Sequence, residues 1–255
     1  MNGGLSLEFE LNQAKAGLRR GDVMVLSPAY ETIWDGTPSG PVLWAALQSQ
    51  PAAWDYVPDG DKVWLLGRIV LDDQPQLLAH DAAVIAFARL RAATVERVRT
   101  AARRAIGRAA RPPDESAYVR SGFNEYGDQT SAWDEESSLS AQPQEPALDR
   151  FPTVQVNEAA SALREFVEWC RDEGVNVVFA YPPVLQDWFR ENEQSITRTS
   201  RMLESQLPIT FINDPIDEAR PPSDFFDMRY HLRGEAVRER TRDLLDGLLR
   251  YRVVH

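Results

Sequence analysis

The segment SDFFDMRYHLRGEAVRERT, residues 223–241, contains a candidate acid–base pair and the beginning of a helix. Asp227 lies four residues before His231, and Gly234 follows where apolar residues start to recur at helical spacing. A carboxylate just ahead of a histidine, at the junction of a loop and a helix, can orient the imidazole as a general base. The alternative interpretation is a solvated histidine in a loop that leads into a helix. The other two histidines lie in an alanine-rich segment and at the last position, so they are weaker candidates.

Short apolar runs alternate with helical segments through much of the chain. Apolar runs bounded by turn residues predict buried parallel strands at residues 22–26, 175–180 and 209–212. The apolar spacing predicts helices at residues 6–18, 156–172, 185–207 and 234–250. This alternation predicts an α/β fold, a three-layer sandwich with a mainly parallel sheet. Because parallel strands end at the same edge of a sheet, we expect Tyr30, Tyr181 and the Asp227/His231 loop to converge there.

Length and composition indicate one large globular domain. We expect residues 1–255 to form a single α/β domain with a helical and loop-rich insertion at residues 35–152. The formal charge of −11 argues against a general nucleic-acid-binding protein. Cys170 is the only cysteine, which excludes an internal disulfide and a cysteine-based metal site. We predict no cofactor and no metal, and neither a signal segment nor a membrane-spanning segment is recognisable.

An arginine-rich helix is predicted inside the insertion. Eight arginines and a single acidic residue fall between Arg89 and Arg111. Three interpretations are open for this segment: a solvated basic face, a helix that lies on an anionic membrane surface, or a contact with another anionic partner. The oligomeric state is not predictable from these patterns.

The last block of the sequence resembles a known superfamily. Asp227-x-x-x-His231-Leu, followed by a terminal helix, resembles the final motif block of SGNH/GDSL-type hydrolases, and it is most similar to a bacterial branch of that superfamily. The resemblance implies that His231 is the general base, that Asp227 orients it, and that both serve a serine nucleophile from the first block. The Tyr30-Glu31 pair resembles the Tyr-Glu that this branch carries in its cleft.

The N-terminal part matches the superfamily less completely. Gly3 and Gly4 resemble the glycine after the second strand, and the resemblance implies that their backbone N–H groups form part of an oxyanion hole. The first strand, which ends in Gly-Asp-Ser, would then lie upstream of Met1, and no Gly-Asp-Ser occurs in the sequence. Ser6 is expected to cap a helix, and Ser27 precedes a proline, so neither is assigned as the nucleophile.

The resemblance implies ester chemistry. The expected function is that of an esterase or O-acyltransferase acting on acyl esters or polysaccharides of the cell envelope, inactive or truncated in this chain because no nucleophile is matched. The alternative is a non-catalytic envelope or polysaccharide-binding protein that keeps a degenerate cleft. An envelope location is expected if an upstream segment exists.

Overall fold

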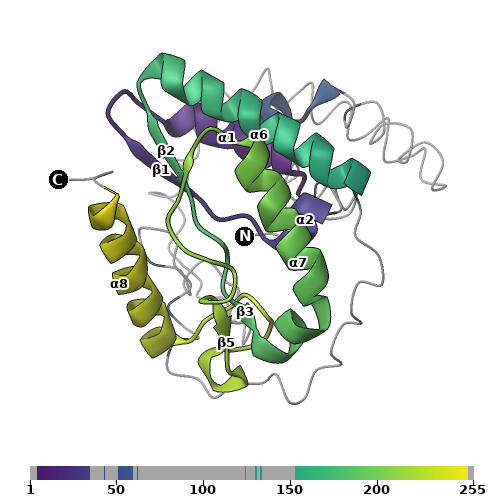
Figure 1. The fold of residues 1–255 in the computed structure, drawn as a ribbon. Helices are drawn as coiled ribbons and strands as arrows, with labels where there is room; N and C mark the ends of the chain where they lie inside the picture. The colour runs from purple at the N-terminus through teal and green to yellow at the C-terminus, as the bar shows by residue number, and fades with distance from the viewer. Residues whose placement is uncertain are drawn as a thin grey trace, which may run out of the picture. The chain divides into compact units, whose positions relative to one another are not determined.

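The computed structural model describes residues 5–34, 43, 51–59, 62, 124, 130, 133 and 153–251 (Figure 1). The chain forms two compact units, one of residues 1–16 and 37–113 and the other of residues 17–36 and 114–255. The arginine-rich segment 89–111, and most of the insertion predicted at residues 35–152, lie outside the described residues. The prediction of a single domain stays a prediction.

The first unit contains helix α1, Leu7–Gly17, and the 3-10 helix η1, Pro51–Tyr56. The N-terminus of α1 is capped as predicted, because the hydroxyl of Ser6 accepts a hydrogen bond of 3.3 Å from the backbone N–H of Phe9. Phe9 is buried in a cluster with Leu43, Ala53 and Val57. The side-chain amide of Asn12 donates to the carbonyl of Tyr56 over 3.1 Å, which ties α1 to the end of η1.

Glu10 on α1 is expected to make the stability of this unit depend on pH. Burial raises the pKa of its carboxyl from 4.5 to about 7. Between these two values the folded state binds more protons than the unfolded state, so the unfolding free energy falls as the pH rises through this range. We expect Glu10→Gln to be more stable than the wild type above pH 7, by up to about 3 kcal/mol, and the difference to disappear near pH 4.

Urea denaturation from pH 4 to pH 8 measures this difference. Glu8→Gln is the matched control, since Glu8 lies on an exposed part of the same helix, and its stability should follow that of the wild type closely. A Glu10→Gln curve that stays parallel to the wild-type curve over the whole range would contradict the prediction.

The second unit is built on a parallel sheet, as predicted. Its strands are β1 (Val23–Leu26), β2 (Asn176–Phe179) and β4 (Thr210–Phe211). They lie in the order β1-β2-β4, and both pairs are parallel. Val25 pairs with Val178, and Phe179 with Phe211. A second parallel pair, which was not predicted, joins the two-residue strands β3 (Val184–Leu185) and β5 (Ala219–Arg220).

The helices of the second unit follow their predicted positions closely. They are α6 (Thr153–Glu173), α7 (Gln186–Gln206) and α8 (Gly234–Arg250), and the short helix α2 (Tyr30–Trp34) occupies a segment expected to be a loop. Figure 1 shows α8 on one side of the β1/β2 pair and α6 with α7 on the other. The fold is therefore mixed α/β with short parallel strands. Among the described residues no helix is both long enough and apolar enough to cross a membrane.

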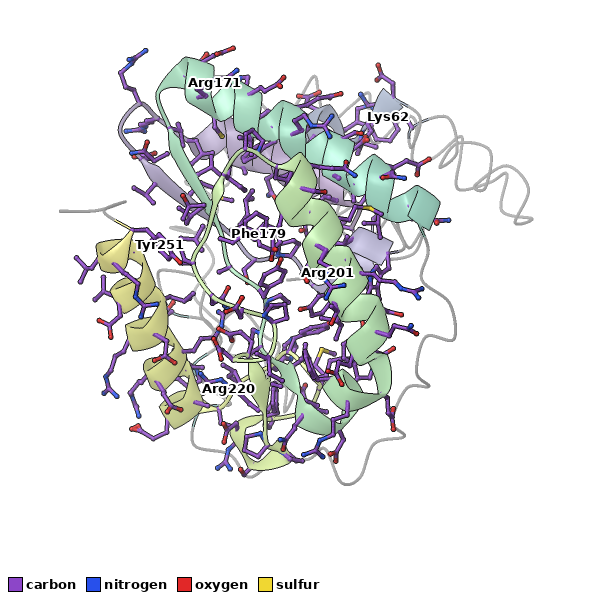
Figure 2. The ribbon with its side chains drawn as sticks, viewed as in Figure 1. Lys62, Arg171, Phe179, Arg201, Arg220 and Tyr251 are labelled. Carbon is purple, nitrogen blue, oxygen red and sulfur yellow. The ribbon has the colours of Figure 1, made fainter. Side chains whose placement is uncertain are left out.

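The alternation of side chains along β2 explains how both faces of the sheet are covered. Val178 and Ala180 point to one face, where they form a cluster with Ile212 and with Leu244 and Leu248 of α8. Phe179 points to the other face and is fully buried there (Figure 2). Its ring lies 5.2 Å from that of Tyr181 and 5.0 Å from that of Phe211, measured between centroids.

Two features hold α8 close to the rest of the unit. A Cβ atom at Gly247 would lie 3.1 Å from the carbonyl oxygen of Ile212, so a larger residue there would push the helix away from the end of β4 by a few tenths of an ångström. Nearer the middle of the helix, Glu239 and Asp243 form ion pairs with the mostly buried Arg220 of β5, at 2.8 Å and 3.1 Å respectively (Figure 2). These contacts fix the helix that follows the His231 loop.

Candidate functional site

The three strands of the main sheet end close to one another, as expected for parallel strands. Ser27 follows β1, Tyr181 follows β2 and Asn213 follows β4. Asn213 closes a pair of hydrogen bonds with the backbone of Tyr181: its amide oxygen accepts from the N–H over 2.7 Å, and its amide nitrogen donates to the carbonyl over 3.1 Å. The loops after β2 and β4 are therefore joined by one side chain.

Arg240 of α8 connects this edge to a buried carboxylate. Its guanidinium donates to the hydroxyl of Ser27 over 3.0 Å and to the carbonyl of Tyr181 over 3.3 Å. It also pairs with Glu218 over 3.1 Å, and the side chain of Glu218 is only 4 % exposed. The second oxygen of Glu218 accepts from Asn213 over 2.7 Å. Four side chains thus form one polar network at the carboxyl ends of the strands.

Asp227 and His231 lie in hydrogen-bond contact, as predicted. Nδ1 of the imidazole is 2.8 Å from Oδ1 of Asp227, and both side chains are mostly buried. The backbone of this loop closes on itself, because the N–H of Phe226 donates to the carbonyl of His231 over 2.8 Å and the N–H of His231 donates to that of Met228 over 3.1 Å. One ring nitrogen of the imidazole, Nδ1, is therefore held by the carboxylate of Asp227 within this loop.

The two residues just before His231 attach the loop to α2. The hydroxyl of Tyr230 donates to one carboxylate oxygen of Glu31, and the guanidinium of Arg229 lies 3.3 Å from the other. The backbone N–H of Tyr30 donates to the hydroxyl of Tyr230 over 3.3 Å. Burial, followed by the negative charge of Glu31, raises the pKa of the Tyr230 hydroxyl well above its ordinary value, so the group remains a donor.

Tyr30 faces the interior of the second unit. Its side chain is 0 % exposed and stacks on Trp34 with a centroid distance of 5.3 Å. Its hydroxyl has no hydrogen-bond partner among the described residues. Burial raises the pKa of this hydroxyl, and the nearby carboxylates of Glu218 and Glu31 raise it further. The backbone N–H of Tyr30 contacts the His231 loop through its hydrogen bond to Tyr230.

The remaining residues predicted for the site have different outcomes. Gly3 and Gly4 lie outside the described residues, so their oxyanion role stays a prediction. The hydroxyl of Ser6 accepts a hydrogen bond from the first turn of α1. The hydroxyl of Ser27 accepts one from Arg240. Glu31 binds Tyr230 and Arg229, an arrangement that its place in the sequence did not indicate.

Sequence reasoning missed several residues of this edge. Tyr230, Arg229, Asn213, Glu218 and Arg240 were not singled out, although all are polar residues in loops after strands or on the terminal helix. Asn213 carried a usable signal, since it directly follows an apolar strand. Arg240 and Glu218 carried none, because they are 22 positions apart, with Glu218 in a turn and Arg240 on a helix.

The described part of the chain offers no obvious metal site, since it holds no group of three or more His, Cys, Asp or Glu side chains placed to bind an ion. A hollow of about 630 Å³ lies along α7 and is lined by residues of both charges, none of them from the His231 loop. Its lining residues are Arg190, Glu191, Glu193, Gln194, Thr197, Arg198 and Arg201.

Comparison of this chain with protein-family models, with curated proteins and with solved structures finds no match in any of the three.

Proposed function

We propose that this chain is an SGNH-type, three-layer α/β protein whose chemistry is ester hydrolysis or O-acyl transfer, with His231 as general base and Asp227 as the residue that orients it. The observation that carries the proposal is the contact of 2.8 Å between His231 Nδ1 and Asp227 Oδ1 in a loop beside the carboxyl end of β1. The resemblance of this block to the final SGNH motif supports the same assignment. Acyl esters, including those of envelope polysaccharides, are the proposed substrates.

The geometry of the pair defines which ring nitrogen would react. Asp227 engages Nδ1, and a carboxylate at that position favours the tautomer that carries its proton on Nδ1. Nε2 then has a lone pair and can accept a proton from a hydroxyl nucleophile. When the imidazole becomes charged, the Asp227 carboxylate stabilises it.

The nucleophile is proposed to come from a Gly-Asp-Ser segment outside these 255 residues. The sequence contains no such segment, and Ser6 and Ser27 have other hydrogen-bond partners. Within the described ranges, β1 is paired on one side only, with β2, although its sequence VMVL is entirely apolar. An apolar strand at an edge is a natural place for a further strand to pair. A strand that ends in Gly-Asp-Ser beside β1 would bring its serine to the same edge as His231.

A fluorophosphonate probe and p-nitrophenyl acetate test this proposal. We expect the 255-residue chain to take no label and to hydrolyse the ester no faster than its His231→Ala variant, because a base without a nucleophile supplies little catalysis. A longer form of the protein that carries Gly-Asp-Ser ahead of residue 1 should take one label and hydrolyse the ester. That activity should fall about 10³-fold or more in His231→Ala.

Ser27→Ala is the matched control, since it removes a hydroxyl at the same sheet edge and should leave labelling and turnover of the longer form unchanged. Stoichiometric labelling of the 255-residue chain would contradict the assignment of the nucleophile, and the labelled residue would identify the correct one. A longer form that binds polysaccharide but neither takes the label nor hydrolyses esters would contradict the enzymatic proposal and favour a binding protein.

A further inference from the structure

We propose that Glu31 is a positioning residue: by holding Arg229 and Tyr230 it fixes the loop that carries Asp227 and His231, and so sets the orientation of the imidazole. The inference deepens the proposed function and rests on it for its consequence in catalysis. It assigns Glu31 a role different from that of a residue lining a cleft. The structural part of the inference stands on contacts that can be tested without any enzymatic activity.

Glu31 uses both carboxylate oxygens on one short stretch of the loop. Oε2 accepts from the hydroxyl of Tyr230, and Oε1 lies 3.3 Å from the guanidinium of Arg229. The side chain of Arg229 is only 13 % exposed, so its charge needs a nearby carboxylate more than a surface arginine would. A hydrogen bond from a hydroxyl to a charged carboxylate is about twice as strong as one between neutral groups. One carboxylate therefore anchors two consecutive residues.

The loop is also held from a second helix. The guanidinium of Arg229 lies over the ring of Trp188 on α7, 4.8 Å from its centroid, and the ring of Tyr230 meets the same indole edge to face. Trp188 in turn packs against Trp34 of α2, with ring centroids 5.9 Å apart. Arg229 and Tyr230 are consequently in contact with both α2 and α7.

Because Tyr230 and His231 are adjacent in the sequence, the contacts that hold Tyr230 also restrict the position of the imidazole. Tyr230 precedes His231 directly, and Asp227 belongs to the same turn, which the hydrogen bond from Phe226 N–H to the His231 carbonyl closes. A shift of Tyr230 would therefore move the imidazole relative to the surrounding sheet edge and strain its contact with Asp227. A displacement of about 1 Å in a reacting group can cost about 10²-fold in rate.

Nitrogen NMR of the His231 imidazole tests the positioning role in the 255-residue chain. The signal is assigned by its loss in His231→Ala. We expect the neutral wild-type ring to carry its proton on Nδ1, toward Asp227. In Glu31→Ala and Tyr230→Phe we expect the Nε2-protonated form, which predominates in free histidine, to become the major one. Glu31→Gln keeps an acceptor for Tyr230 but loses the charge that faces Arg229, so its tautomer ratio should be intermediate.

Tyr181→Phe is the matched control. It too removes a tyrosine hydroxyl that donates to a glutamate, here Glu204 over 2.9 Å, but on α7 and not on the loop. It should lower the unfolding free energy by an amount similar to Tyr230→Phe without changing the His231 tautomer. An unchanged tautomer in folded Tyr230→Phe and Glu31→Gln would overturn the inference even if Glu31→Ala fails to fold.

The catalytic consequence is measured separately, in the longer form that carries the nucleophile. There Glu31→Ala should lower kcat about 10²-fold while KM changes much less, because the change acts through the position of the imidazole. If that form proves inactive, the proposed function fails while the NMR result still decides the positioning role. If it is active and kcat is unchanged in Glu31→Ala, the positioning role fails while the proposed function stands.

Discussion

Replacing Glu218 by alanine is expected to lower the unfolding free energy of the second unit by about 3–5 kcal/mol. The Glu218 side chain is 4 % exposed, and it accepts from Arg240 over 3.1 Å and from Asn213 over 2.7 Å. Without it, a largely buried guanidinium loses its counter-charge and an amide N–H loses its acceptor, and both losses are costly away from water. Urea denaturation followed by tryptophan fluorescence measures the change.

The control for Glu218 is an ion pair of the same length on the surface of α8. Glu235 and Arg238 are also 3.1 Å apart, but their side chains are 79 % and 50 % exposed. Glu235→Ala should therefore cost about 1 kcal/mol or less. A double variant, Glu218→Leu with Arg240→Met, should recover part of the loss, since it leaves no unpaired charge. Equal costs for Glu218→Ala and Glu235→Ala would refute a structural role for the buried network.

Replacing Phe179 by alanine is expected to cost about 3–5 kcal/mol as well, for a different reason. The side chain is fully buried, and its ring packs against those of both Tyr181 and Phe211. Removing it deletes apolar contacts and leaves a cavity that the surrounding aromatic rings can fill only partly. Phe179→Leu, which keeps most of the volume, should cost clearly less.

Tyr251→Ala provides the comparison for Phe179, because it removes an aromatic side chain that is 49 % exposed at the end of α8. Its effect should stay within about 0.5 kcal/mol. Thermal unfolding of the three variants, with near-ultraviolet circular dichroism to follow aromatic packing, separates the two cases. A Phe179→Ala protein as stable as Tyr251→Ala would mean that this side of the sheet is not a packed core.

Much of the second unit could be predicted from local patterns. The segments 22–26, 175–180 and 209–212 are short apolar runs bounded by turn residues, and the three form a parallel sheet. The helices were found because their apolar residues repeat every three to four positions. Strands β3 and β5 were missed because two residues are too short to show a period, and α2 was missed because five residues carry little helical signal.

The candidate site also has contacts that the sequence predicts and contacts that only the folded unit creates. Asp227 and His231 are four residues apart in one turn, so their proximity could be predicted from the sequence alone. Tyr230 and Glu31 are separated by 199 positions, and Arg240 and Ser27 by 213, so only the tertiary structure could pair them. The physical reason is that apolar periodicity depends on which face of an element is buried and can be read locally. The partner of a polar side chain depends instead on which loops the packed sheet brings to one edge, and that is decided only when the whole unit has folded.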